Sequence, residues 1–136
     1  MTYAISSALQ TAVYQVLQND AALALQVGTD IFDSAPVGQV PALYVSIGAE
    51  DVRDSSDQSG YGARHDFTVA VVTTQSGFLT AKDVAAAICD ALLAAPMSLT
   101  RGRVVSMNFL QARARRVQSG GARRIDLRFR ARVEDN

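Results

Sequence analysis

Several residues that catalytic and export signatures depend on are scarce in this chain of 136 residues. It contains one histidine, His65, so a Ser-His-Asp triad or a Cys-His pair would have to use that residue. The single cysteine, Cys89, has no partner for an internal disulfide, so the cysteine content gives no sign of an oxidising compartment. We therefore expect the chain to be made and folded in the cytoplasm.

Membrane, nucleotide and metal signatures are lacking as well. No apolar run approaches the roughly 20 residues that a membrane span requires, and the first residues lack the basic start of a signal peptide. The glycines form neither the GxGxxG pattern nor the GxxxxGK(S/T) pattern of phosphate-binding loops. Asp51, Asp54 and Asp57 recur every three residues, but without the glycine turn and terminal glutamate of a calcium loop. We predict no enzymatic activity, no catalytic residues, no cofactor, no metal site and no membrane contact.

What the chain has is enough apolar material for one core. Apolar residues make up 49% and charged residues 19%, which fits a single domain over residues 1–136. The net charge of zero conceals a polarity along the chain. Residues 1–100 hold three basic and ten acidic side chains, whereas residues 101–136 hold ten arginines and three acids. The C-terminal region is basic enough to need a functional explanation.

Apolar spacing predicts the secondary structure. Three- and four-residue spacing predicts two main helices, over residues 5–17 and 81–93. Alternation of apolar and polar residues, or β-branched content, predicts strands at 43–47 and 67–72. Two further alternating segments flank a glycine turn at 118–121, which predicts a long C-terminal β-hairpin. The order predicts an α+β fold, in which two main helices pack on one face of an antiparallel or mixed β-sheet.

A short second helix that ends at Gly28 and a brief strand at Ile31–Phe32 complete the predicted order. The core should form where the two main helices cross one face of the sheet. Its predicted members are the apolar residues on those facing surfaces: Leu9, Val13, Val69, Ile88, Leu92, Ile125, Leu127 and Phe129.

The segment from Gly48 to Gly62 differs in composition from the rest of the chain. It is acidic, rich in serine and glycine, and almost free of apolar anchors. A loop this long in a small domain is usually functional or becomes ordered on contact with a partner. We therefore predict a mobile loop at about residues 49–62 that contacts a partner, such as a neighbouring copy of the chain. Its candidate contact residues are the charged and aromatic ones: Glu50, Asp51, Arg53, Asp54, Asp57 and Tyr61.

An arginine stripe marks the predicted hairpin. Arginines alternate with apolar residues along the last strand, and two more share one face of its predicted partner strand. Like charges side by side repel, so such a stripe is often balanced by an anionic partner. A subunit interface, a solvated face and a nucleic-acid contact are all compatible with it, and an interface with the acidic segment of another copy is favoured. The candidate interface residues are Arg113, Arg115, Arg124, Arg128, Arg130 and Arg132.

Landmarks along nearly the whole chain resemble one protein family. They are the opening helix Leu9–Asp20, Val27–Asp33 followed by Pro36, Pro41–Gly48, Gly62–Val69 leading into a strand, the helix Ala81–Leu93, and Leu127–Arg132. Their order and spacing are similar to those of the tail terminators, small phage proteins also called tail completion or head-tail joining proteins. The alanine- and arginine-rich composition is also compatible with a gene transfer agent, a domesticated phage-like particle.

The resemblance implies a structural role in the virion tail, at the head-tail junction. It implies a ring of six copies that stops growth of the tail tube and joins the tube to the head-tail connector, with DNA passing through the lumen. The partners would be other copies of the chain, the tail tube protein and the connector or stopper protein. The family has no catalytic residues to assign to this sequence.

The main alternative is a small nucleic-acid-binding module that uses the arginine hairpin. The net charge of zero counts against it, as does the lack of aromatic residues among the arginines, since Phe129 lies on the apolar face of its strand. For His65, which follows Arg64 and precedes Asp66, we predict a hydrogen bond at a strand edge or interface.

Overall fold

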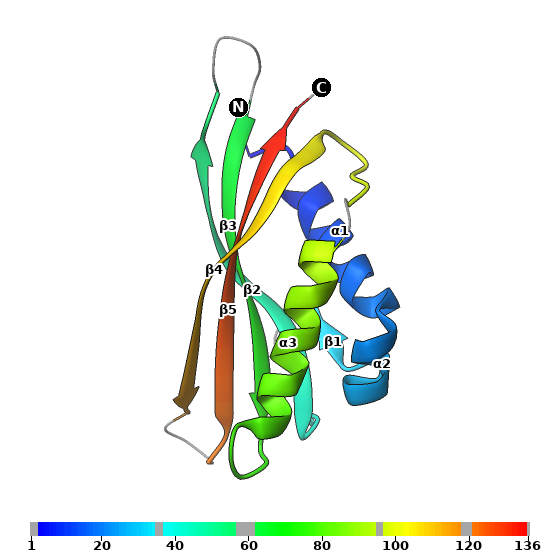
Figure 1. The fold of residues 1–136 in the computed structure, drawn as a ribbon, viewed down its shortest axis with the longest axis vertical. Helices are drawn as coiled ribbons and strands as arrows, with labels where there is room; N and C mark the ends of the chain where they lie inside the picture. Colours follow the sequence, from blue (N-terminus) through cyan, green and yellow to red (C-terminus); the bar gives the residue numbers. More distant parts are fainter. Residues whose placement is uncertain (1–2, 35–36, 57–61, 95–96, 118–120, 136) are drawn as a thin grey trace.

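The computed structural model describes residues 3–34, 37–56, 62–94, 97–117 and 121–135. They form two layers: a long twisted sheet, and helices that cover one of its faces (Figure 1). This arrangement confirms the predicted α+β class with a C-terminal strand pair.

Three helices form the covering layer. α1 spans Ser6–Asn19 and α2 spans Ala21–Val27, and the two are separated by Asp20. The Asp20 carboxylate accepts a hydrogen bond from the Leu23 backbone N–H at 3.0 Å, which caps the start of α2. α3 spans Leu79–Ala94 and turns an apolar side toward the sheet. Each helix therefore buries one stripe, as the spacing of apolar residues predicts.

The sheet has five strands: β1 (Ile31–Phe32), β2 (Leu43–Asp54), β3 (Gly62–Thr73), β4 (Arg103–Arg116) and β5 (Arg123–Glu134). Their order across the sheet is β1-β2-β3-β5-β4. β1 pairs in parallel with β2 and every other pairing is antiparallel, so the sheet is mixed. The last strand lies inside the sheet between β3 and β4, which makes β4 a long edge strand.

Residues 49–54 belong to strand β2 and Gly62 to strand β3, so the prediction of a loop at 49–62 is wrong for these residues. β2 continues past a bulge between Ile47 and Glu50, and its pairing with β3 runs on to Asp54 opposite Ala63. The polar composition of this segment suggested a loop, but it has another cause. One face of this part of the sheet has no covering layer, so the residues on that face can be polar. Asp57 and Tyr61 lie outside the described residues.

The predicted core is confirmed. All eight predicted residues are at most 3% exposed, and they belong to one cluster between the helices and the sheet. Phe67 and Phe129 stack near its centre, with ring centroids 5.7 Å apart. Burial is most complete on the central strand β3, whereas on β5 every second residue from Ile125 to Val133 is buried.

The helices leave part of β4 uncovered. Val104 and Met107, near its start, are partly buried against the core. From Asn108 to Arg116 every residue is exposed, including Phe109 at 44% and Leu110 at 37%. This half of the edge strand is therefore accessible on both faces.

Candidate interaction surface

The arginines identified in the sequence lie on the face of the sheet that turns away from the helices. Arg113 of β4 stands opposite Asp126 of β5, and Arg115 stands opposite Arg124. Because paired residues point to the same face, these two arginines share the surface formed by the four candidate arginines of β5. We call this helix-free surface the arginine face. All six candidate arginines therefore lie on one side of the sheet.

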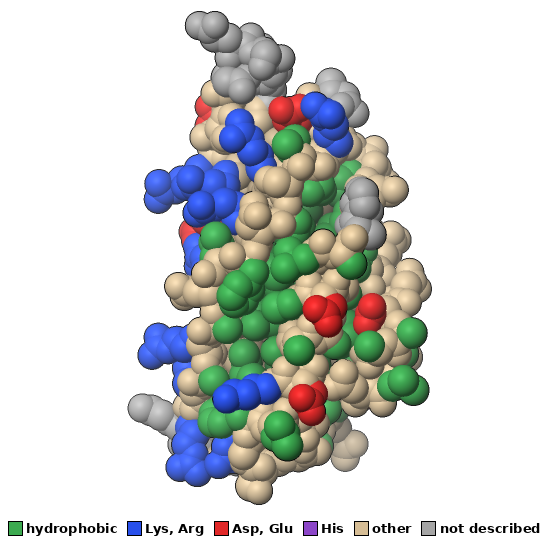
Figure 2. Space-filling view, in the orientation of Figure 1, with side chains coloured by type: hydrophobic (Ala, Val, Ile, Leu, Met, Phe, Trp, Pro, Cys, Tyr) green, Lys and Arg blue, Asp and Glu red, His purple; other side chains and the backbone are tan. Residues whose placement is uncertain are grey.

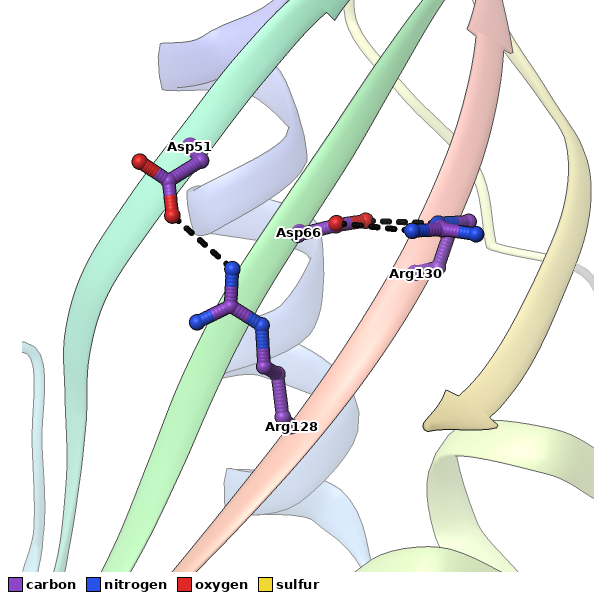
Figure 3. A network of polar contacts seen from close by, with 4 residues as sticks. All are labelled: Asp51, Asp66, Arg128 and Arg130. Atoms are coloured by element: carbon purple, nitrogen blue, oxygen red, sulfur yellow. Dashed lines mark hydrogen bonds and ion pairs between the residues drawn. The ribbon is translucent and has the colours of Figure 1, made fainter. Parts of the chain in front are cut away.

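Two of these arginines are paired with aspartates of the same chain. The Arg130 guanidinium donates two hydrogen bonds to the Asp66 carboxylate, at 2.8 and 3.0 Å, and Arg128 donates one to Asp51 at 2.8 Å (Figure 3). The hydrogen bonds from Arg130 hold the pKa of Asp66 below its usual range. A two-point contact of this kind, with Asp66 only 9% exposed, is the stronger of the two pairs. Asp51 is well exposed, so its pair contributes little.

The sequence favours a neighbouring copy as the source of the counter-charges, but Arg128 and Arg130 find them within their own chain, and their place at a subunit interface stays a prediction. Asp51 belongs to β2 and Asp66 to β3, and β3 is placed directly beside β5. A non-local strand order of this kind leaves no local trace in a sequence. One signal in the sequence could have placed Asp51 on a strand. Partly buried Glu50 and Val52 alternate with exposed Asp51 and Arg53, which is the two-residue period of a strand.

The other arginines of this face are balanced less completely. The Asp126 carboxylate accepts a hydrogen bond from Arg124 at 2.7 Å and lies 3.5 Å from Arg115. Arg132 donates to the Ser55 carbonyl at 3.4 Å. Arg113 is exposed and has no ion-pair partner among the residues that the structure describes.

Opposite charges collect on the two layers. At the outward positions of β2 to β5, four acids (Asp51, Asp66, Asp126 and Glu134) accompany nine arginines: 53, 64, 103, 113, 115, 124, 128, 130 and 132. This is an excess of five positive charges. The described residues 3–34 and 79–94, which hold the helices and the short strand β1, carry one lysine and five aspartates: 20, 30, 33, 83 and 90. This is an excess of four negative charges.

Two candidates of the expected contact loop have local roles. Glu50 points to the helix side of β2, where its carboxylate accepts hydrogen bonds from the hydroxyls of Tyr3 and Ser6. Asp54 ends β2 and accepts a hydrogen bond from the Ser56 hydroxyl at 2.7 Å, which lowers its pKa to about 2. Arg53 is exposed on the arginine face.

His65 lies in the core and not at a strand edge, so that prediction is wrong. It is 0% exposed, and neither ring nitrogen has a hydrogen-bond partner in the described part of the chain. Burial lowers its pKa, and the Glu50 carboxylate, 3.8 Å from Nδ1, opposes this effect. The position could have been found from the two-residue period, because His65 shares its strand face with Phe67 and Val69.

Other reactive groups are not gathered into a site. Cys89 is half-buried, and burial raises the pKa of its thiol, which disfavours the nucleophilic thiolate. Among the described residues, no three His, Cys, Asp or Glu side chains lie together as a metal site would require. No described helix is long and apolar enough to span a membrane. The feature that stands out chemically is the distribution of charge over the surface, which suits contacts with other macromolecules.

Comparison with known proteins identifies the family. A family model described as tail completion protein gp17 matches residues 11–134. The chain belongs to this family. It is therefore a structural protein of a phage-type tail. The match begins within α1 and ends at the last residue of β5, so the arginine face lies inside the tail completion domain.

A solved structure supports the assignment. The chain is 55% identical to a chain in a structure of the virion of a native gene transfer agent particle, with a TM-score of 0.91. The similarity covers 98% of this chain and 99% of that chain. No individually curated protein matches this tail completion protein. The family supplies the tail and the solved structure supplies the virion, and together they place this chain in the tail of a virion or virion-like particle.

Proposed function

We propose that the chain is the subunit of a homo-oligomeric ring, with six copies, that closes the end of the tail tube. The ring stops tube growth and joins the tube to the head-tail connector, and DNA passes through its lumen. The observation that carries the proposal is the similarity, over 98% of the chain, to a chain of a gene transfer agent virion. The particle to which this protein contributes is then a gene transfer agent or a related phage-like particle.

The distribution of charge supports assembly from identical copies. One molecule offers a basic arginine face and an acidic helix layer, so copies can attract one another while the net charge of each is zero. A contact between two different surfaces repeats from copy to copy, and it produces a ring when the rotation closes. Exposed apolar residues on the edge strand, including Val105, Phe109 and Leu110, add surface that association would bury.

Within this proposal the candidate residues divide into two groups. Arg113, Arg115, Arg124 and Arg132 face other subunits, whereas Arg128 and Arg130 contribute less because Asp51 and Asp66 already offset their charges. The C-terminal end of β2 and the N-terminal end of β3 extend beyond the helix layer (top of Figure 1). Asp51, Arg53 and Asp54 lie along this extension, and we assign them to contacts with an adjoining ring, the tube or the connector.

Electron microscopy of the purified protein, combined with native mass measurement, tests the ring. We expect a ring with a central hole and a mass of about six times the 14.5 kDa of one chain. A protein that stays monomeric when concentrated, and that forms no ring in purified particles, would contradict the proposal.

The second candidate is a nucleic-acid-binding module, and the excess of five positive charges on the arginine face favours it. A ring through which DNA moves must not hold it, so we expect sequence-independent binding no tighter than the ~10⁻⁴–10⁻⁶ M of non-specific contacts. Fluorescence anisotropy over a salt series distinguishes the two functions. A Kd below about 1 μM at about 150 mM salt, with a steep salt dependence, would favour the nucleic-acid module.

A further inference from the structure

A groove runs over the helix layer on the side of the molecule away from β4. It lies between α1 and α2 on one side and α3 on the other, and has a volume of about 640 Å³. Small side chains leave this space open, among them Ala22, Ala87 and Ala91. Asp83 and Asp90 of α3 also line it, and both are exposed. We call this surface the helix groove.

The helix groove carries uncompensated negative charge. Neither Asp83 nor Asp90 has an ion-pair partner among the described residues. Asp20 adds a third carboxylate, one oxygen of which already caps α2. Alanine walls with charged neighbours suit an occupant that has small side chains and positive charges.

The exposed half of β4 has those properties. Ala112 and Ala114 point to the helix side of the sheet, opposite Leu127 and Ile125, while Arg113 and Arg115 point to the other side. Arg116 ends the strand, and neither it nor Arg113 has an ion-pair partner within the described ranges. We call residues 109–116 the β4 edge.

The two surfaces lie on opposite sides of one molecule. Figure 2 shows most lysine and arginine side chains along the border that β4 forms, whereas several of the acidic side chains lie over the helices, away from that border. A contact between the β4 edge of one copy and the helix groove of the next would therefore leave the opposite surface of each copy free for a third. Such a contact continues from copy to copy, which is the geometry that a ring needs.

We infer that the β4 edge of each copy docks against the helix groove of the next copy. In this contact Arg113, Arg115 and Arg116 face Asp83 and Asp90, and alanines on both sides allow the strand and the helices to approach closely. The occupant is a second copy of this chain because the complementary charge is carried by the chain itself, on its far side. The inference rests on the proposed ring and specifies the surfaces that form it.

A charge-swap experiment tests this contact. The first variant carries Arg113→Asp and Arg115→Asp, and the second carries Asp83→Arg and Asp90→Arg. All four side chains are exposed, so both variants should fold, which circular dichroism and thermal melting verify. We expect each variant alone to lose the ring and to show the 14.5 kDa mass of a single chain.

An equimolar mixture of the two variants should form rings again. The mutated edge of the first variant then faces the mutated groove of the second, and the two unmutated surfaces face each other, so the copies alternate around the ring. The matched control changes Arg101 and Arg103 to Asp, near the other end of β4, where they pair with Asp135 and Glu134. This control variant should still form rings, as the unmodified chain does.

The outcomes separate this inference from the proposed function. If the unmodified chain forms rings and either variant forms them equally well alone, the docking surfaces are wrong and the ring stands. Failure of the mixture to form rings, although each variant is folded, would also overturn the pairing of these two surfaces. If the unmodified chain forms no ring under any condition, both the proposed function and this contact are contradicted.

Discussion

At the scale of single residues, Gly102 fixes how the edge strand starts. Its φ is +73°, and an added Cβ would lie 2.5 Å from the Ile5 Cδ1 and 2.6 Å from the Glu134 carbonyl oxygen. Only glycine combines this backbone conformation with such close neighbours. The turn before β4 is therefore packed directly against the residue that precedes α1 and against the end of β5.

We expect Gly102→Ala to destabilise the fold by more than the roughly 1–3 kcal/mol of left-handed strain, because the methyl group also clashes. Gly121→Ala is the matched control, since its φ of +70° is similar but no atom of the described residues beyond its chain neighbours lies within 4 Å of an added Cβ. Urea unfolding of both variants measures the difference. Equal losses of stability would show that the neighbours of Gly102 yield easily and that the close packing has no energetic weight.

His65 should make the stability depend on pH. Because burial lowers its folded-state pKa, the unfolded chain binds a proton more readily, so stability is full above about pH 6.5 and falls as the pH drops below it. His65→Leu removes this group with little change in size. Urea unfolding at pH 7.5 and 5.5 should show a clear loss for the unmodified chain and a smaller loss for the variant. The same loss in both proteins would assign the effect to groups other than His65.

At the scale of secondary-structure elements, α3 joins the two layers. Leu92 points into the core and is 1% exposed, whereas its neighbour Leu93 is 45% exposed. We expect Leu92→Ala to cost about 2–5 kcal/mol, the usual range for removing a large buried side chain. Leu93→Ala, the same change on the outer side of the helix, should cost well under 1 kcal/mol. Similar costs measured by denaturant titration would mean that the wrong face of α3 is taken as buried.

The elements that could be predicted from sequence are those with an apolar period. β5 alternates partly exposed and buried residues from Arg124 to its end, and this period places its arginines on the correct face. The extension of β2 from Glu50 to Asp54 lacks a clear apolar period and was therefore not predicted. One of its faces is open to solvent, and the other holds the charged Glu50 as well as Val52. The strand order β2-β3-β5 depends on packing between distant segments, so the Asp66–Arg130 pair could not be foreseen.

At the scale of the whole molecule, the division of charge along the chain becomes a division across its thickness. Most acids of the first 100 residues lie in the helix layer or pair with arginines of the sheet, and the C-terminal arginines stay in excess on the opposite face. The sequence shows that both charges are present, but only the folded chain shows that they point in opposite directions. This arrangement is what makes head-to-tail contacts between identical copies favourable.

The most direct test of the central claim is made on particles assembled without this chain. If the protein closes the tail tube and joins it to the head, cells that produce the particle but lack this chain should yield heads without tails and separate tubes of variable length. Supplying the chain from a plasmid should restore joined particles with tails of uniform length, as counted by electron microscopy. Joined particles with normal tails in the absence of the chain would contradict the account.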